Sequence, residues 1–237
     1  DINFGIITLS GIEGTLVPED NINGEFSIQY QALDGTLFSE PATLTVHILP
    51  VNDPPVISTI LNQSINEDET FYYQLDVVDI DSDSLIFTIA DIDHADAYIN
   101  DNTLTISPDN NFNGSLTVEV SVSDGEFSDV ETFILDVLPV NDAPDLSDIG
   151  EQSSLEDEAF TLDIVANDVD GDNLSYWSNS SQYADVSFTD NQLLVIPHDD
   201  WFGEINITVN VTDGEYIDSD EFVIDVLPVN DAPILST

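Results

Sequence analysis

Apolar and polar residues alternate along several stretches of the chain. Phe71, Tyr73, Leu75 and Val77 occupy every second position of one stretch, and residues 116–123 show the same alternation. Further stretches with this pattern are residues 133–137, 205–211 and 222–226. A period of two with one apolar face is typical of a half-buried antiparallel strand. The pattern therefore predicts β-strands at these places, and no segment has a clear helical period.

One polar linker occurs three times at a fixed interval. The sequence Pro-Val-Asn-Asp begins at Pro50, Pro139 and Pro228, so successive copies are 89 residues apart. A fixed period with the same linker at each joint indicates one module copied along a line. The predicted segments are a partial module at residues 1–53, full modules at 54–142 and 143–231, and the start of a further module at 232–237.

Each full module is predicted to be a β-sandwich. Short strands separated by Asp-Gly and Asn-Gly turns, about seven per module, are typical of that fold. The chain is 41% hydrophobic, with 12 Phe and 7 Tyr, which is enough apolar surface for one core in each module. The predicted fold class is therefore all-β, with tandem antiparallel sandwiches of cadherin/Ig-like type in a linear array.

When the module copies are aligned with one another, the partial module matches only the later part of a full module. For example, Gly24 falls in the same alignment column as Gly114. Its front strands have no counterpart in residues 1–53, and residues 232–237 are too few to supply them. Two explanations stay open. The chain is a window cut from a longer array, or a neighbouring molecule supplies the missing strands, as in strand-complemented fibres. We favour the window.

The net charge of the chain excludes several classes of binding partner. The chain has 49 Asp and Glu, no Lys or Arg, and a formal net charge of −49. Neutralisation must therefore come from bound metal ions, solvent cations or salt. Such a surface repels nucleic acid and anionic lipid, so neither is an expected partner. No stretch approaches the length of a membrane span, so we expect no membrane insertion. Cysteine is absent, which excludes disulfides and zinc–thiolate sites.

Several columns are acidic in both full modules. They include Glu67/Glu156, Asp68/Asp157, Glu69/Glu158, Asp79/Asp168, Asp81/Asp170, Asp83/Asp172 and Asp124/Asp213. A general acidic bias would scatter carboxylates over a solvated surface. Recent duplication would copy every position, yet many other positions differ between the copies. We therefore interpret the linker Asn-Asp pairs and the Asp-x-Asp pairs as metal ligands, with Glu67 and Glu156 as further candidates.

The ligand types suit calcium. In an extended segment Asp79 and Asp81 point the same way, about 6.6 Å apart along the chain. Ca²⁺ takes six to eight oxygen ligands in irregular cages, so loops and a linker can assemble one site. Residues 168–172 look like the start of an EF-hand loop. Asn179 stands where the loop needs its bidentate Glu, and no helices flank it, so we reject an EF-hand.

The chain resembles the cadherin-like repeats of prokaryotic surface and secreted proteins, about 90–100 residues long and ending in Val-Asn-Asp-Ala-Pro. The motifs that carry the resemblance are the linker, the Glu-Asp pair after it, the Asp-x-Asp-x-Asp run, the Ser/Thr-Asp-Gly turn and the Pro-x-x-x-Phe/Trp-x-Gly segments that end at Gly114 and Gly203. The resemblance covers essentially the whole chain. It implies Ig-like sandwiches with calcium at the joints.

In cadherins the linker, the Asp-x-Asp loop and a later Asp of the following repeat share calcium with a Glu of the preceding repeat. For the second joint the resemblance implies Asn141, Asp142, Asp168, Asp170 and Asp213, with Glu67 from the preceding module. The matching residues at the other joints are Asn52, Asp53, Asp79, Asp81 and Asp124, and Glu156, Asn230 and Asp231. Pro139 replaces the first linker Asp and the Asp-Arg-Glu motif is missing, so we expect fewer or weaker ions per joint.

Other residues are assigned ordinary roles. His47, His94 and His198 fall in unrelated columns and are predicted to lie on the surface, because a repeated site would repeat its ligands. Trp201 is predicted to pack into the core. Trp177 is predicted to be exposed, which gives a weak indication of sugar stacking. Carboxylate pairs could imitate a glycosidase dyad, but no nucleophile or cleft is specified, so we expect no enzyme.

We therefore expect a non-enzymatic, calcium-stiffened rod at the cell surface or outside the cell, serving as a stalk or fibre in adhesion or surface assembly. Its partners are neighbouring modules or identical chains, and its target is a surface glycan or a protein receptor. Two alternatives stay open. A self-polymerising filament would complete residues 1–53 with strands from another chain. A carbohydrate-binding module of a secreted hydrolase would have an aromatic platform around Trp177.

Overall fold

The structure is a computed structural model that describes residues 5–10, 13–81 and 84–231. The chain divides into two compact units, residues 1–138 and 139–237. Two sequence predictions fall outside the described residues: Asp83 of the Asp-x-Asp-x-Asp run and the start of a further module at 232–237. In the described part of the chain, no helix is long and apolar enough to cross a membrane.

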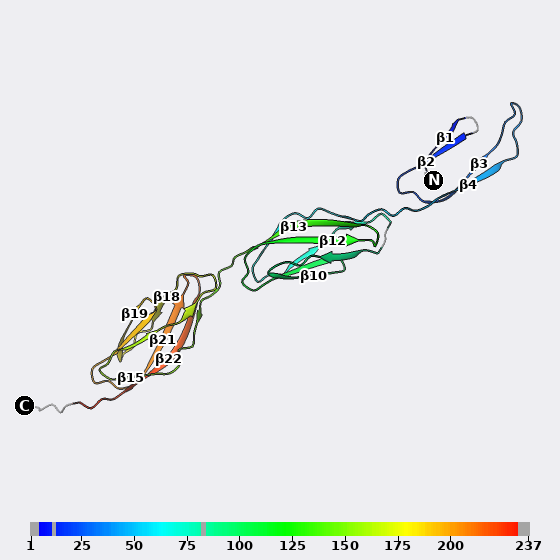
Figure 1. Ribbon diagram of the computed structural model, residues 1–237. Helices are drawn as coiled ribbons and strands as arrows, with labels where there is room; N and C mark the ends of the chain where they lie inside the picture. The colour runs from blue at the N-terminus through cyan, green and yellow to red at the C-terminus, as the bar shows by residue number, and fades with distance from the viewer. Residues whose placement is uncertain (1–4, 11–12, 82–83, 232–237) are drawn as a thin grey trace, which may run out of the picture. The chain divides into compact units, whose positions relative to one another are not determined.

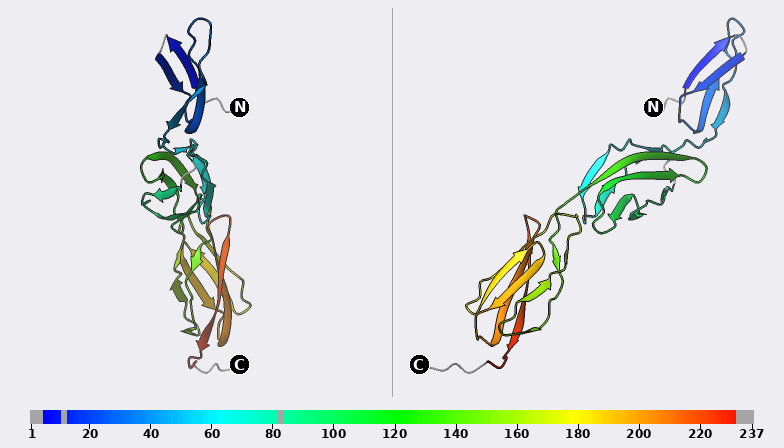
Figure 2. Two further views of the ribbon diagram at one scale, coloured as in Figure 1. Left: turned by 90° about the vertical axis from the view of Figure 1, so that its right-hand side faces the viewer. Right: turned by 60° about the vertical axis from the view of Figure 1, so that its left-hand side comes forward.

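Residues 1–53, here called the half-module, contain two hairpins among the described residues. Their strands are β1 (Gly5–Ser10), β2 (Glu13–Pro18), β3 (Gly24–Tyr30) and β4 (Ala42–Ile48). β1 pairs with β2, and β3 pairs with β4, both antiparallel. Figure 2 shows these hairpins in blue. The columns of the repeat place β1 to β4 in register with the last four strands of a full module.

Residues 54–142, the second module, fold into two facing sheets. The strands are β5 (Val56–Ile57), β6 (Gln63–Asn66), β7 (Phe71–Gln74), β8 (Val77–Val78), β9 (Ile86–Ile89), β10 (Ala95–Asn100), β11 (Thr103–Pro108), β12 (Gly114–Ser123) and β13 (Ser128–Leu138). One sheet has the order β6-β13-β12-β9, the other has the order β10-β11-β7, and β5 pairs with β8. Figure 1 shows β12 beside β13 and β10 in the other layer.

Residues 143–231, the third module, repeat this arrangement. The strands are β14 (Asp145–Leu146), β15 (Gln152–Leu155), β16 (Phe160–Asp163), β17 (Ala166–Asn167), β18 (Ser175–Ser178), β19 (Ala184–Thr189), β20 (Gln192–Pro197), β21 (Gly203–Thr212) and β22 (Ile217–Leu227). The sheets have the orders β15-β22-β21-β18 and β16-β20-β19, and β14 pairs with β17. The predicted all-β tandem sandwich is confirmed.

The predicted alternation sets which side chains form the cores. Leu116, Val118, Val120 and Val122 on β12 are all at most 3% exposed, while polar residues between them face solvent. On the neighbouring strand, the ring of Phe133 lies 6.2 Å from Phe71 and 6.3 Å from Tyr73, measured between ring centroids. These aromatic contacts join the two sheets across the core.

Two details of the strand arrangement differ from the prediction. Each full module has nine described strands rather than about seven, since β5, β8, β14 and β17 are two-residue strands. The sandwiches are also not purely antiparallel, because β6 pairs parallel with β13 and β15 pairs parallel with β22. The reason is that β6 and β13 both run toward the exit end of the module. Directly after β6, the N–H of Glu67 donates to the carbonyl of Leu138 at 2.8 Å.

The stretch 71–78, predicted as one strand, is divided between the sheets. β7 pairs with β11, whereas β8 pairs with β5. At the break, the N–H of Leu75 donates to Asn102 and the carbonyl of Asp76 accepts from Ser58, each at 2.8 Å. The chain thus changes partners while its apolar face stays buried, with Leu75 only 1% exposed. The alternation of apolar and polar residues continues where the chain passes from one sheet to the other. The sequence pattern therefore did not predict the break between β7 and β8.

The Pro-x-x-x-Phe/Trp-x-Gly segment forms a tight turn into the long strand of each module. Gly114 and Gly203 have φ values of +146° and +130°, which favour glycine. A Cβ added at Gly114 would lie 3.3 Å from the ring of Phe112, and one at Gly203 would lie 3.2 Å from Trp201. The aromatic ring therefore covers the glycine, which explains the spacing of the motif.

Carboxylates on the last strand hold the first segment of each module. In the second module, Asp129 accepts the N–H of Ile57 at 2.9 Å and Glu131 accepts the N–H of Ile60 at 3.0 Å. The matching bonds in the third module join Asp218 to Leu146 and Asp220 to Ile149, each at 2.8 Å. These columns are acidic in both modules, yet their role is structural. Recurrence of a carboxylate is therefore not by itself proof of a metal ligand.

Candidate metal centre

The first linker is hydrogen-bonded to the module that follows it. The side-chain amide of Asn52 donates to Oδ2 of Asp124 at 2.8 Å. The backbone N–H of Asp53 donates to Oδ2 of Asp81 at 2.7 Å, and the N–H of Asp81 donates to Oδ1 of Asp79 at 2.9 Å. The fold thus brings five predicted ligands together around one linker.

The second linker makes the same bonds with the third module. The amide of Asn141 donates to Oδ2 of Asp213, and the N–H of Asp142 donates to Oδ2 of Asp170, both at 2.8 Å. The N–H of Asp170 donates to Oδ1 of Asp168 at 3.0 Å. The same atoms are used in both modules, so this network is a property of the repeat.

The short strands after each linker explain why these side chains meet. β5 pairs with β8, with Val56 opposite Val78, and the Asp-x-Asp loop begins at the next residue. β14 pairs with β17 in the same way, with Asp145 opposite Asn167. Because each pairing begins a few residues after the linker, the loop is held beside the linker. The remaining predicted ligand of each site, Asp124 or Asp213, lies in the turn between the last two strands of its module.

That turn fixes the orientation of its carboxylate. Oδ1 of Asp124 accepts the backbone N–H groups of Phe127 and Glu126, each at 2.7 Å. These two hydrogen bonds hold the pKa of Asp124 below its ordinary value of 3.8. Oδ2 of Asp124 faces the linker and accepts from Asn52. One oxygen therefore holds the turn, and the other serves the candidate site.

The equivalent turns behave alike. Partial burial raises the pKa of Asp213, but hydrogen bonds from the N–H groups of Glu215 and Tyr216, at 2.6 and 2.7 Å, outweigh it, so the pKa lies below 3.8. In the half-module, hydrogen bonds from Leu37 and Thr36 lower the pKa of Asp34. The turn therefore forms even in the half-module, where the front strands of a full module have no counterpart.

These lowered pKa values predict the direction of a pH effect. Because the folded pKa of Asp213 lies below 3.8, its charge stabilises the turn at every pH above that ordinary value. This stabilisation is lost as the pH falls below 3.8 through the folded pKa. We expect the stability difference between the wild type and Asp213→Asn to be constant near neutral pH and to shrink in strong acid. Urea unfolding at several pH values measures it, and a difference that persists unchanged at about pH 2 would contradict the assignment.

Asp168 has an oxygen that suits a cation. Its Oδ1 accepts the N–H groups of Asp170 at 3.0 Å and Asp172 at 3.2 Å. Its Oδ2 is buried and has no hydrogen-bond donor among the described residues. A buried carboxylate oxygen without a donor is costly unless a cation compensates it. Since the chain has no Lys or Arg, a hard metal ion bound by oxygen ligands fits this position.

Glu67 and Glu156 are both buried, each with 3% of its surface exposed. Glu156 lies beside the linker that leaves its own module. Its N–H donates to the carbonyl of Leu227 at 2.9 Å, and its Oε1 accepts the N–H of Val229 at 2.6 Å. The resemblance places this Glu at the exit end of its module, and the third module has it there.

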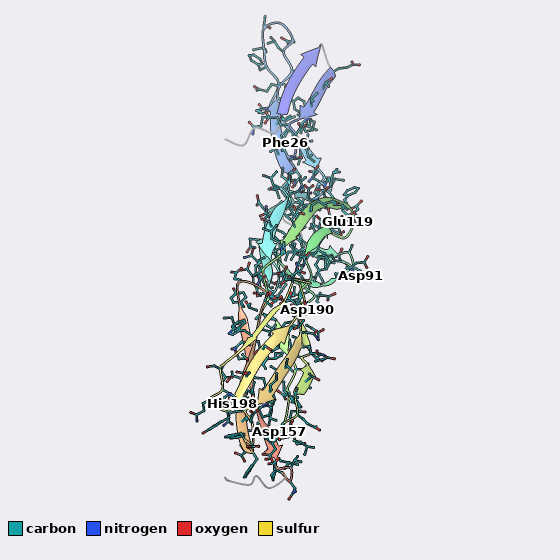
Figure 3. The ribbon with its side chains drawn as sticks, turned by 90° about the vertical axis from the view of Figure 1, so that its left-hand side faces the viewer. Phe26, Asp91, Glu119, Asp157, Asp190 and His198 are labelled. Atoms are coloured by element: carbon teal, nitrogen blue, oxygen red, sulfur yellow. The ribbon has the colours of Figure 1, made fainter. Side chains whose placement is uncertain are left out.

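A cluster of exposed carboxylates lies at the same end of the third module. Carboxylate oxygens of Asp157, Asp200 and Asp231 lie within 4.8 Å of one another. Figure 3 labels Asp157 near this end. Of the three, only Asp231 was among the predicted ligands. Asp200 was missed because its column holds Asn111 in the second module, while the repeated Asp157 column was visible in the sequence.

The structure thus gathers predicted ligands into two kinds of group. Each entry linker meets its Asp-x-Asp loop and the turn Asp. At the exit end of the third module, Glu156 accepts from Val229, and Asp231 lies near Asp157 and Asp200. Asn230 is exposed and donates to the carbonyl of Asp231 at 3.3 Å, so its role as a ligand stays a prediction. Oxygen donors of these types hold hard divalent cations.

The histidines lie on the surface, as predicted. His47 is 3.3 Å from Glu25 and His94 is 3.5 Å from Asp109, with all four side chains more than 60% exposed. His198 is exposed. None of these histidines is among the groups of possible metal ligands found in the described residues.

The two tryptophans differ in exposure. Trp201 is half-buried against the core and stacks on Tyr183 with ring centroids 4.5 Å apart. Trp177 is 39% exposed, as predicted, and lies opposite Asn210 on β21. Its neighbour Tyr176 points to the other face and stacks on Phe188 inside the module. Tyr176 and Trp177 therefore lie on opposite faces of β18, and the carbohydrate alternative stays a prediction.

Comparison with known proteins shows which family and which solved structures this chain resembles. The profile of the bacterial Ig domain matches residues 52–135 and 141–226. A search of curated proteins gives no match. Human CDH23 EC21-23 is a similar solved structure, with a TM-score of 0.56 and 16% identity over 89% of this chain and 77% of that chain. Mouse protocadherin-24 EC1-3 has a TM-score of 0.50 and 16% identity over 93% of this chain and 86% of that chain.

An endo-fucoidan hydrolase, MfFcnA4 from glycoside hydrolase family 107, is also similar, with a TM-score of 0.36 and 18% identity. The match covers 96% of this chain, but this chain spans only 38% of that hydrolase. Identities this low show the fold alone. The profile match and the cadherin structures confirm the predicted resemblance to cadherin-like, Ig-like tandem repeats.

Proposed function

This chain belongs to the bacterial Ig domain family, and we propose that it is a non-enzymatic, calcium-stiffened rod of tandem repeats, located outside the cell as a stalk or fibre in adhesion or surface assembly. The observation that carries the proposal is the repeated bonding of each Asn-Asp linker to the Asp-x-Asp loop and the turn Asp of the module after it.

Calcium would be held by carboxylate and amide oxygens of the described residues. At the second linker these are Asn141, Asp142, Asp168, Asp170 and Asp213, and the buried Oδ2 of Asp168 supports this choice. Glu67 of the preceding module is proposed to add a further oxygen. When bound, the ion supplies positive charge that the protein itself lacks.

Stiffness follows from electrostatics. Two like charges 4 Å apart repel by about 4 kcal/mol at an effective dielectric constant of 20. Carboxylates gathered at a linker therefore favour separation of the segments that carry them. A divalent cation between them reverses the sign of that interaction, so bound calcium should add to the hydrogen bonds that hold the linker.

The absence of catalysis is part of the proposal. Carboxylates in the described residues hold turns, as Asp124 does, or hold backbone segments, as Asp129 and Glu131 do. The exposed histidines occupy unrelated columns and have no repeated partner set. A set of groups with these tasks supports a structural role better than an active site.

Partners follow from the charge. We propose neighbouring modules and identical chains as the first partners, and a surface glycan or a protein receptor as the target. With 49 acidic residues and no Lys or Arg, the modules repel acidic partners. A receptor that contacts them must therefore present cations of its own or bind through metal ions.

Paired substitutions test the calcium site. We expect Asp168→Ala with Asp170→Ala to remove strong calcium binding at the second linker and to leave the first linker unchanged, as measured by titration calorimetry on the full chain. Asp79→Ala with Asp81→Ala should do the reverse, because each loop serves the linker before it.

Glu221→Ala with Asp225→Ala is the matched control. Both residues are exposed on β22, and their removal takes away the same charge. Equal loss of binding in this control would mean that calcium is held only as a diffuse counterion. Equal loss at both linkers in either loop variant would mean that loops are assigned to the wrong linkers.

A further inference from the structure

The outer face of the sheet β10-β11-β7 carries two tyrosines in one row. Tyr98 on β10 lies opposite Thr105 on β11, and Thr105 lies opposite Tyr72 on β7. Residues directly opposite each other on neighbouring strands share one face of the sheet. Tyr73, the next residue on β7, points the other way and packs against Phe133 in the core. The two tyrosines therefore face away from the core, on either side of Thr105.

Both tyrosine rings are open to solvent. Tyr72 is 67% exposed and Tyr98 is 59% exposed, whereas Thr105 between them is 6% exposed. Neighbouring strands lie about 4.8 Å apart, so the two tyrosines are about 10 Å apart across the sheet. The ring contacts found among the described residues involve other aromatic side chains. The two rings therefore do not stabilise the sheet by stacking on each other, as directly opposed aromatic residues do.

Polar side chains flank the row of tyrosines on the same face. On one side lie Asn100, Thr103 and Gln74, which are opposite one another on the three strands. On the other side, Asp96 lies opposite Ser107. Each flanking row is about 7 Å from the tyrosines along the strands. Amide, hydroxyl and carboxylate groups at this distance can form hydrogen bonds with both edges of a ligand that lies over the rings.

The third module shows that the fold does not need these rings. Thr161 and Ser187 stand in the columns of Tyr72 and Tyr98, and both lie opposite Leu194 in the same register. The sandwich therefore forms with small side chains at these positions. Two large exposed rings in one row, which the fold does not require, indicate a binding surface.

We infer that the tyrosine row, formed by Tyr72, Thr105 and Tyr98, binds a neutral, extended, β-1,4-linked polysaccharide. The flat face of a sugar ring carries C–H groups that pack on the negative face of an aromatic ring. Equatorial β-1,4 linkages keep the sugar rings in one flat ribbon, with hydroxyls along both edges. A chain lying across the strands would stack on both tyrosines and present its hydroxyls to the flanking rows. The net charge of −49 repels acidic or sulfated sugars, so the ligand is neutral.

This inference gives the glycan target of the proposed function a chemical class and a place on the chain. It does not need calcium, because none of the predicted metal ligands belongs to β7, β10 or β11. Binding is therefore measured in EDTA, so that its failure and the failure of the calcium proposal are separate results. Because the ligand is uncharged, we expect the same affinity at about 0.1 M and about 1 M NaCl.

The test titrates the full chain with four neutral β-1,4-linked hexasaccharides, those of glucose, xylose, mannose and N-acetylglucosamine. We expect at least one of them to bind with a Kd of about 0.1 mM by calorimetry. Maltohexaose, whose α-1,4 linkages curve the chain, should bind at least about 10-fold more weakly. Hydrogen exchange with the ligand bound should slow in Phe71–Gln74 and Ala95–Asn100.

Variants locate the contact. Tyr72→Thr with Tyr98→Ser gives the second module the residues of the third, so the fold should be kept, and we expect the Kd to rise beyond about 10 mM. Tyr72→Phe keeps the ring and should change the affinity by less than about 3-fold, because stacking needs the ring and not its hydroxyl. Trp177→Ala is the control, since it removes another exposed ring on the third module.

Four outcomes would each overturn the inference. They are no binding of any of the four hexasaccharides at about 10 mM, equal affinity for maltohexaose, unchanged affinity in the double tyrosine variant, and loss of binding in Trp177→Ala. The last outcome would place the glycan site on the third module instead.

Discussion

Chelation of calcium is expected to lower the Tm of the second and third modules by about 10 °C or more. Ligand at 100 times its Kd stabilises the folded state by about 2.7 kcal/mol. A change of 1 kcal/mol shifts the Tm of a domain of 60–100 residues by about 4–8 °C. The physical reason is that bound calcium neutralises carboxylates such as Asp168 and Asp170, which the fold holds close to one linker.

Calorimetry in calcium and in EDTA measures this effect, and NaCl at matched ionic strength separates ion binding from screening. Small-angle scattering on the same samples reports the maximum dimension, which should vary more widely without calcium. Magnesium is the second control, since it demands near-octahedral geometry and dehydrates reluctantly. An unchanged Tm and an unchanged scattering profile in EDTA would remove calcium from the proposed function.

Truncation of one core ring is expected to destabilise one module by about 3–5 kcal/mol. Phe222 is 3% exposed in the core of the third module, and Phe133 is 2% exposed in the same column of the second module. Phe222→Ala should lower the Tm of the third module by more than about 12 °C and leave the second module nearly unchanged. Phe133→Ala should have the reverse effect, because the modules have separate cores.

Calorimetry in EDTA resolves the two transitions, and hydrogen exchange assigns each to its residues. Ile217→Ala is a control within the same strand, since Ile217 is 59% exposed and its truncation leaves no cavity. If either ring variant lowered both transitions equally, the two cores would unfold as one cooperative unit. That result would contradict a rod of nearly independent repeats.

The sequence predicted the strands with long alternation most accurately. Residues 116–123 and 205–211 lie within β12 and β21, and their apolar residues are buried as predicted. It did not predict the break between β7 and β8, because the apolar face continues while the backbone changes partners. It also did not predict the parallel pairing of β6 with β13, which is set by the order in which the strands pack.

The candidate metal centre was also predicted only in part from the sequence. The linker, the Asp-x-Asp pairs and the turn Asp were visible as repeated columns, and the structure brings them together through hydrogen bonds. Asp129 and Glu131 had the same signal but accept hydrogen bonds from the first segment of the module. Sequence columns report that a carboxylate is retained between copies, and only the contacts show what it binds.

The sequence by itself determined the repeat, the all-β fold class, the joints and the absence of Lys and Arg as partners for the carboxylates. These properties follow from periodicity and composition, which are local or additive along the chain. The tertiary structure decided which carboxylates meet a linker and which hold a strand. Those outcomes depend on contacts between residues about 28–72 positions apart, such as Asp53 with Asp81 and Asn52 with Asp124, and only the packing of the strands brings such residues together.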